Sequence, residues 1–203
     1  MRSPWAREYA RTPQRYIWGT TPSPLAREAA ALLRPGARVL DLGCGEGRDS
    51  VFFAAAGHRV VAVDIAPAGL DKGQRLARAR QVRVTWVAAD LAALPLRGAF
   101  DLVYSCGAIH YVPRARRADL FPELQAATRP RGWHACVVFT DRLVYVEKGE
   151  VIDYFQPGEL RAAYAGWRIL RHEERLIACD QDGTPHQHSV EELIAAAPAP
   201  PAA

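Results

Sequence analysis

The segment from Val39 to Arg48 constrains this chain more than any other. It reads Val-Leu-Asp-Leu-Gly-Cys-Gly-Glu-Gly-Arg, a short apolar strand followed by three alternating glycines. A helical pattern comes next, and a second apolar strand ends at Asp64. Glycines at a strand-to-helix turn permit positive φ angles and a close approach to a ligand. Because an acid about 20 residues after such a loop can bind ribose hydroxyls, the segment predicts a nucleoside-cofactor loop.

The glycine spacing separates two kinds of nucleoside cofactor. A dinucleotide fingerprint reads G-x-G-x-x-G, whereas Gly43, Gly45 and Gly47 read G-x-G-x-G. Asp41 precedes them, and a carboxylate there suits a cationic ligand but repels a pyrophosphate. The pattern resembles motif I of the class I S-adenosylmethionine (SAM) methyltransferases. The alternatives are a dinucleotide site, as in a nicotinamide-dependent oxidoreductase, and a purely structural glycine turn.

The resemblance implies how the cofactor is held. The loop cradles the methionine end of SAM, with Asp41 facing the ammonium and Asp64 following the second strand. Asp90 accepts a hydrogen bond from the adenine amino group, and the amide of Leu91 donates to the ring; the other interpretation of Asp90 is a helix N-cap. The full set of expected cofactor positions is Trp18, Asp41, Gly43, Cys44, Gly45, Asp64, Ile65, Asp90, Leu91 and Cys106.

Apolar strands alternate with amphipathic helices along most of the chain, which indicates βαβ units and a parallel sheet. In such a sheet the loops after the strands surround one crevice. Segment 186–195 suits either a helix or a final strand, and 130–132 reads as a turn. We expect strands at 39–42, 59–63, 82–88, 100–104, 133–140 and 167–177. We expect helices at 25–33 (with its start signal at 20–24), 47–56, 67–80, 114–128 and 160–164.

The segment Phe100 to Cys106 resembles motif IV of the same superfamily. The resemblance implies that Cys106 and the loop after it pass beside the reactive methyl group. Ser105 and Cys106 are poor magnesium ligands, so we expect no metal there. His110 and Tyr111 are the candidate catalytic residues, with His110 either a base or a packing residue. Cys106, like Cys44, is either a reactive thiol or a small apolar residue under the ligand.

Two segments narrow the family. They are Leu40 to Asp64, and Phe155 to Trp167 with the pattern Phe-Gln-Pro-Gly-Glu-Leu-Arg-x-x-Tyr-x-Gly-Trp. Together they resemble the tellurite-resistance methyltransferases of the TehB type, close relatives of thiopurine S-methyltransferases. The resemblance implies an α/β, Rossmann-like class I fold in a single domain, with helices on both faces of a seven-stranded, mostly parallel sheet. It also implies metal-free, in-line methyl transfer from SAM to a small soft nucleophile (tellurite, selenite or a thiol). The alternatives are O-, N- or C-methylation of a small metabolite, and a SAM-binding regulatory protein without activity.

The expected domain layout has three parts. Residues 1–20 form an irregular aromatic arm, whose Trp18 either closes over the cofactor or covers the sheet edge. Residues 21–197 form the methyltransferase domain, and 198–203 form a disordered Pro/Ala tail.

Acceptor-side residues are the least patterned. Some family members carry a His-Arg pair where this chain has Ile177 and Ala178. The resemblance therefore implies no general base and no anion-binding arginine at these two positions. The substrate candidates are instead Arg15, Arg48, His186 and His188. His186 and His188, near Cys179 and Asp182, suggest either a metal site or a polar surface. Because the sequence shows no defined third ligand, we expect no metal.

Composition limits the partners. The chain of 203 residues has a net charge of +4, with its arginines scattered among acids, so nucleic-acid binding is not expected. No segment approaches the roughly 18 apolar residues of a membrane span, and the N-terminus has no signal-peptide core. The four cysteines form no C-x-x-C pair. We therefore expect a cytoplasmic protein with a small-molecule acceptor; the sequence leaves the oligomeric state open.

Overall fold

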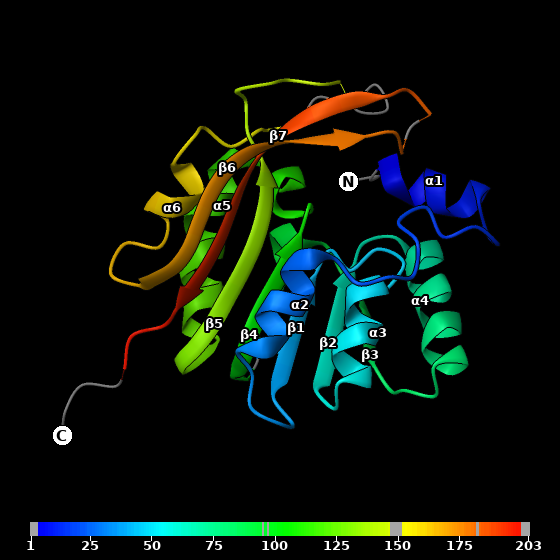
Figure 1. Ribbon diagram of the computed structural model, residues 1–203, viewed down its shortest axis with the longest axis horizontal. Coiled ribbons are helices and arrows are strands. Elements are labelled where there is room, and N and C mark those ends of the chain that lie inside the picture. Colours follow the sequence, from blue (N-terminus) through cyan, green and yellow to red (C-terminus); the bar gives the residue numbers. More distant parts are fainter. Residues whose placement is uncertain (1–3, 95, 97, 147–151, 182, 200–203) are drawn as a thin grey trace.

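Seven strands form one sheet in the computed structural model, which describes residues 4–94, 96, 98–146, 152–181 and 183–199. The strands are β1 (Arg38–Leu42), β2 (Arg59–Asp64), β3 (Thr85–Ala88), β4 (Phe100–Cys106), β5 (Thr128–Phe139), β6 (Arg168–Cys179) and β7 (His186–Ala196). Their order is β3-β2-β1-β4-β5-β7-β6 (Figure 1). β7 runs antiparallel to both neighbours, and the other pairs are parallel. The strand order reverses between β1 and β4, which is where ligands bind in such sheets.

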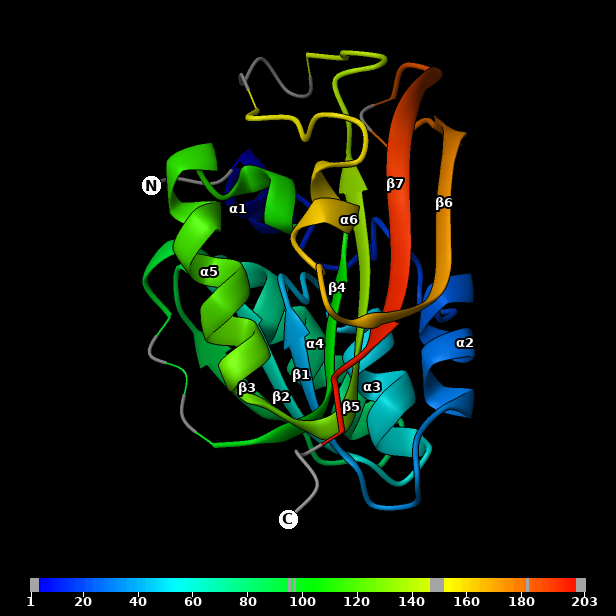
Figure 2. The same cartoon turned by 90° about the vertical axis from the view of Figure 1, so that its left-hand side faces the viewer.

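Helices cover both faces of the sheet. They are α1 (Pro4–Arg11), α2 (Pro24–Ala31), α3 (Arg48–Ala55), α4 (Pro67–Ala79), α5 (Arg114–Ala126) and α6 (Glu159–Ala162), with the short 3₁₀ helices η1 (Leu91–Ala93) and η2 (Ile109–Tyr111). Figure 2 shows α2 and α3 on one face and α5 and α6 on the other. Figure 1 shows α1 beyond the carboxyl ends of β1 and β2.

The apolar strands bury both of their faces, as parallel strands between helices do. Along β1, Val39 packs in a cluster with Leu25 of α2. The next residue, Leu40, packs on the opposite side with Leu120 of α5. Successive side chains of a strand point to opposite faces, so one run of apolar residues supplies two cores.

The expected α/β architecture is confirmed: a seven-stranded, mostly parallel sheet with helices on both faces. The segment that suited either a helix or a strand is β7. It is a strand because it pairs along its length with β6 and, from Val190 onward, with β5. Its first residues, His186 to Ser189, extend past the carboxyl end of β5 and continue the pairing with β6 alone.

Two local expectations are wrong. The arm is not irregular throughout, because Pro4–Arg11 forms α1 and buries Trp5 and Tyr9. The turn expected at 130–132 lies inside β5, where Arg131 has a φ of 61°. There the pairing with β4 jumps from Thr128 to Trp133, so the turn residues form a bulge within a strand.

The expected Pro/Ala tail begins with ordered backbone. The N–H of Arg131 donates to the carbonyl of Pro198 at 3.3 Å, whereas 200–203 lie outside the described residues. Among the residues that the structure describes, no helix has the length and apolar character that crossing a bilayer requires.

Candidate functional site

A cavity of about 660 Å³ lies at the carboxyl ends of the central strands. The loops after β1 to β4 line it, together with the arm and the tip of the β6–β7 hairpin. All the cofactor positions expected from the sequence are among the lining residues: Trp18, Asp41, Gly43, Cys44, Gly45, Asp64, Ile65, Asp90, Leu91 and Cys106. The sequence therefore located one continuous site.

Positive φ angles shape the glycine loop. Gly43, Gly45 and Gly47 have φ values of 69°, 53° and 79°, which residues with a Cβ rarely adopt. The N–H of Gly43 donates to the carbonyl of Val63 at 2.8 Å. The N–H of Gly45 donates to Oδ2 of Asp64, also at 2.8 Å. The end of β2 thus fixes the loop after β1.

Asp41 lies beneath this loop and is 2% exposed. Its Oδ2 accepts a hydrogen bond of 2.5 Å from Oγ of Ser50. Burial raises the pKa of Asp41 to about 7, although the Ser50 bond acts in the opposite direction. A cationic ligand group beside this carboxylate would favour its ionised form.

Asp64 and Asp90, the other two acids expected to bind the cofactor, are partly buried and line the cavity. Each also has a hydrogen-bond partner in the backbone. Oδ1 of Asp64 accepts from the N–H of Ala66 at 2.8 Å, and burial raises the pKa of Asp64. Asp90 is the N-cap of η1, where its Oδ1 accepts from the N–H of Ala92 at 2.8 Å. The capping interpretation of Asp90 is therefore confirmed, and capping does not remove Asp90 from the cavity wall.

Cys44 and Cys106, the thiols expected beside the cofactor, are neutral near pH 7. Burial raises the pKa of Cys106 to about 11 and that of Cys44 well above its usual value. A thiol of high pKa is a poor nucleophile because the thiolate is the reactive form. This favours the interpretation of both residues as small apolar groups in the wall.

The expectation that His110 acts as a base beside the acceptor is wrong in its geometry. The ring is completely buried, outside the residues that line the cavity, and stacks on Phe139 at 4.1 Å. Its Nδ1 accepts the N–H of Phe139 at 3.2 Å, and burial lowers its pKa well below the usual range. The packing interpretation of His110 therefore applies. Tyr111 does line the cavity, where its hydroxyl accepts from Nε1 of Trp5 at 2.7 Å.

The candidate substrate residues separate into two groups. Arg48 and His188 line the cavity. Arg15 is exposed outside it, so a role in holding the substrate is wrong for Arg15. His186 lies behind His188 with Nε2 atoms 2.9 Å apart. Asp182, the acid named beside these histidines, lies outside the described residues.

Arg48 is aimed into the cavity by neighbouring groups. Its Nη2 lies 3.2 Å from Oδ2 of Asp49, and its Nη1 donates to the carbonyl of Trp18 at 3.4 Å. Asp49 is itself fixed by the hydroxyl of Tyr104 at 2.8 Å and the N–H of Ser23, also at 2.8 Å. This buried network positions a cation beside Cys106, whose Sγ lies 4.0 Å from Nη2.

The sequence did not reveal how the arm attaches to the site. Trp5 and Tyr9 lie four residues apart on α1, face the cavity, and are joined there by Trp18. Nε1 of Trp18 donates to the hydroxyl of Tyr9 at 3.1 Å. The i, i+4 spacing of two aromatics is a sequence signal of one helix face. Glu46 accepts the N–H of Trp18, and Lys72 donates to Thr12 and to the carbonyl of Arg15. Both residues thus link the arm to the site, but their sequence positions show no comparable spacing.

The sheet, its switch point and the glycine loop define the class of the domain. Residues 39–132 match the family described as "Methyltransferase domain". The chain therefore contains a class I SAM-dependent methyltransferase domain, and SAM is the cofactor of this class.

Solved structures place this domain near the TehB type in fold. TehB from Haemophilus influenzae superposes with a TM-score of 0.76 at 20% identity, over 85% of this chain and 61% of that one. A TehB-like SAM-dependent methyltransferase from Corynebacterium glutamicum gives a TM-score of 0.66 at 20% identity, over 94% and 95% of the two chains.

A curated relative is similar over most of the chain. "Hemagglutinin 1" of Eikenella corrodens is 31% identical over 182 residues, which is 88% of this chain and 60% of that protein. The chain thus spans about three fifths of the length of this relative.

Proposed function

We propose that this domain transfers the methyl group of SAM to a small soft nucleophile of the tellurite, selenite or thiol class. The acceptor attacks the methyl carbon in line with the departing sulfonium sulfur. The new bond forms from the acceptor's electron pair, and the broken C–S bond leaves its pair on S-adenosylhomocysteine. Catalysis then consists mainly of holding the two reactants about 3–3.5 Å apart in a dry pocket.

The observation that supports this proposal most is the guanidinium of Arg48 in the cavity wall beside Cys106. A fixed cation stabilises an anionic acceptor. His110, the base candidate of the β4 loop, is turned away and engaged by Phe139. A soft anion needs no base, whereas a neutral hydroxyl or amine does.

We also propose the cofactor roles expected from the sequence: Asp41 for the ammonium, Asp64 for the ribose and Asp90 for the adenine. Residues 4–20 would act as a lid, with Trp18 over the bound donor. The lid role is supported by the position of Trp5, Tyr9 and Trp18 in the cavity wall. A closed lid would exclude water from the reacting sulfur.

The test is a product screen by mass spectrometry with SAM and paired acceptors, each thiol matched by its alcohol, together with selenite and tellurite. Methylation of the soft member of each pair, without the alcohol, is expected. Arg48→Ala should lower kcat/KM for anionic acceptors by about 10- to 100-fold, since hydrogen bonds to charged groups contribute about 1.5–3 kcal/mol. Arg15→Ala, which removes an exposed arginine outside the cavity, is the matched control. Turnover of alcohols or amines alone, with SAM binding intact, would overturn the proposal.

The second candidate is methylation of an oxygen, nitrogen or carbon of a metabolite. His188 favours it, because this imidazole lines the same cavity and could accept a proton. The screen separates the two functions, since only the second predicts that His188→Gln abolishes turnover of a neutral hydroxyl while leaving SAM affinity unchanged.

A further inference from the structure

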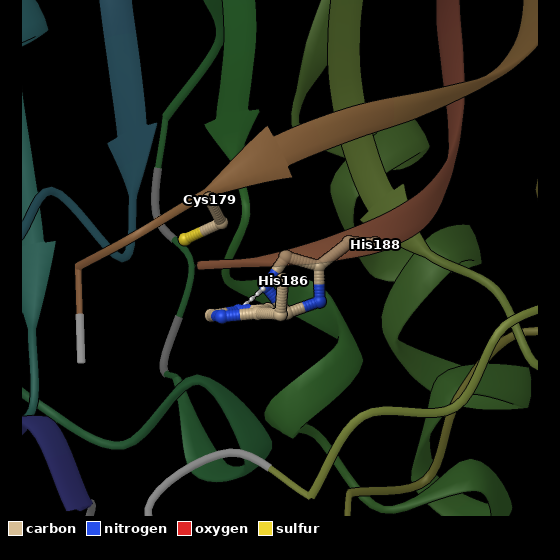
Figure 3. Close-up of side chains that lie close together, drawn as sticks. All are labelled: Cys179, His186 and His188. Carbon is tan, nitrogen blue, oxygen red and sulfur yellow. Dashed lines mark hydrogen bonds between the residues drawn. The ribbon is translucent and has the colours of Figure 1, made fainter. Parts of the chain in front are cut away.

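Three metal-ligating side chains meet at the tip of the β6–β7 hairpin. Cys179 and His186 are directly opposed in the antiparallel register, and His188 lies two residues further along β7. Residues at i and i+2 share a face of a strand, so the register brings all three together. One ligand atom from each residue lies within 4.8 Å of the others. Figure 3 shows the thiol and the two imidazoles gathered at one point.

A hydrogen bond to the backbone sets the tautomer of His186 that a metal ligand needs. Its Nδ1 lies 2.6 Å from the carbonyl oxygen of Thr184. A carbonyl can only accept, so Nδ1 carries the proton and Nε2 of the neutral ring holds a lone pair. That lone pair faces Nε2 of His188 at 2.9 Å (Figure 3). Metal-bound histidines usually donate their other N–H to a carbonyl or carboxylate in this way.

Aromatic stacking fixes both rings. Tyr145 lies flat on His186, with centroids 3.6 Å apart and planes 5° apart. Phe139 stacks on His188 at 4.1 Å and 16°. Packing that locks the ligand rotamers lowers the cost of assembling a site.

The cluster belongs to the wall of the cofactor cavity. Cys179 and His188 line the same cavity as Asp41 and Cys106. The hairpin reaches this position because His186 to Ser189 run past the end of β5. An ion held by the three side chains would therefore have room for a further ligand on the cavity side.

We propose that Cys179, His186 and His188 bind Zn²⁺, and that the fourth coordination position takes the thiol of the methyl acceptor. One thiolate with two imidazoles is a zinc ligand set, and three protein ligands with one open position are the pattern of catalytic zinc. This inference rests on the proposed function and narrows its acceptor to a thiol. It adds a metal on the acceptor side, where the sequence predicts no metal.

Zinc binding and methyl transfer to the bound thiol release two protons and leave one electron pair on the departing sulfur. Binding of Zn²⁺ releases the proton of Cys179, and the proton that His188 shares with His186 moves to Nδ1 of His188, so both Nε2 atoms coordinate. Entry of the acceptor thiol releases a second proton to solvent, because a coordinating thiol is deprotonated. The zinc thiolate then forms a C–S bond to the methyl carbon of SAM. The bond between that carbon and the sulfonium breaks, and its electron pair remains on S-adenosylhomocysteine.

The first experiment measures the metal alone. Zn²⁺ is titrated into the full chain by calorimetry in the absence of SAM, and Co²⁺ is used as a spectroscopic probe. One ion per chain and a thiolate-to-cobalt charge-transfer band are expected. Cys179→Ser should remove the band, and His186→Gln should weaken Zn²⁺ binding by more than the roughly 10- to 100-fold that loss of an outer-shell partner costs. His58→Gln, a histidine remote from the cavity, is the control. Zn²⁺ binding that Cys179→Ser and His186→Gln leave unchanged would overturn the site.

The second experiment separates this inference from the proposed function. Thiol methylation is measured in the metal-free protein and after addition of Zn²⁺, with SAM binding measured in parallel. Activity that requires Zn²⁺ and is lost in Cys179→Ser supports the inference. Equal thiol turnover with and without Zn²⁺ would overturn the zinc inference and leave the proposed function intact. Zinc binding with SAM binding but without turnover of any soft acceptor would overturn the proposed function and the acceptor role of the ion.

Discussion

Glu46 and Lys72 form a completely buried ion pair, with Nζ of Lys72 2.7 Å from Oε1 of Glu46. The same Nζ donates to Oγ1 of Thr12 at 3.0 Å and to the carbonyl of Arg15 at 2.8 Å. Oε2 of Glu46 accepts the N–H of Trp18 at 3.1 Å. One buried cation thus joins α4, the glycine loop and the arm that covers the cavity.

Removing one partner of this pair should destabilise the protein strongly. Lys72→Met leaves the Glu46 carboxylate buried without its cation, and breaking a buried pair costs about 3–5 kcal/mol. The free energy of unfolding, measured by urea denaturation, should fall by that amount. SAM should also dissociate faster, because the arm loses its attachment to the loop.

The matched control is Asp119→Ala, which removes an ion pair on the surface of α5. Arg116 and Asp119 lie 3.8 Å apart and Asp119 is 74% exposed, so the loss should be about 0–1 kcal/mol. Equal losses for the two variants would contradict the role given to Lys72.

Asp41 should make SAM binding depend on pH. With a pKa of about 7, Asp41 is largely protonated at pH 6 and ionised at pH 8. If the carboxylate faces the ammonium of SAM, affinity should rise about tenfold between these values. Asp41→Asn should bind more weakly and lose this dependence; a pH-independent affinity of the unchanged protein would refute the assignment.

Asp41 should also make the free energy of unfolding depend on pH, with the trend opposite to that of SAM affinity. Its folded pKa of about 7 lies above the unfolded value of about 3.9. Between these two values the folded state holds the extra proton, so the free energy of unfolding should decrease as pH rises. Asp41→Asn should flatten this part of the stability profile, as measured by urea denaturation at pH 4 to 7.

Gly47 should tolerate no side chain. It has a φ of 79°, and a Cβ would lie 2.5 Å from the ring of Trp86 and 2.9 Å from Cα of Gly73. Gly47→Ala therefore adds overpacking of about 1–3 kcal/mol to a backbone strain of about 1–2 kcal/mol. Gly57→Ala isolates the strain, because Gly57 has a φ of 87° and nothing within 4 Å of its Cβ position. Thermal unfolding of both variants should show the larger loss for Gly47→Ala; equal losses would mean that α4 and Trp86 relax freely.

Cys106 should resist alkylation in the ligand-free folded protein. With a pKa of about 11, only about one thiol in 10⁴ is ionised at pH 7, and the thiolate is the form that reacts. Peptide mass spectrometry after iodoacetamide treatment should find Cys106 unmodified at pH 7 and modified after unfolding in urea. Modification at the rate of an unfolded cysteine would show that the site does not raise the thiol pKa.

Much of the fold could be predicted because the evidence is local. Apolar runs such as Val60 to Val63, and the glycines of the loop, specify strand and turn within a few residues. The residue pattern does not predict α1, because a helix this short is stabilised by packing rather than by propensity. Pro130 and Gly132 predict a turn. The backbone does turn at Arg131, but β5 continues through it as a bulge.

The sequence by itself determined the cofactor side of this protein. Asp41 lies near the end of β1, Gly43 and Gly45 follow that strand, and Asp64 ends β2. The order of these strands along the chain, with right-handed crossovers, brings the four residues to one crevice. The tertiary structure alone decided the rest. The ring of His110 points into the core, and Glu46 forms a buried ion pair with Lys72. The strand register places Cys179 opposite His186. Register and burial depend on contacts between distant segments, which no local pattern of residues encodes.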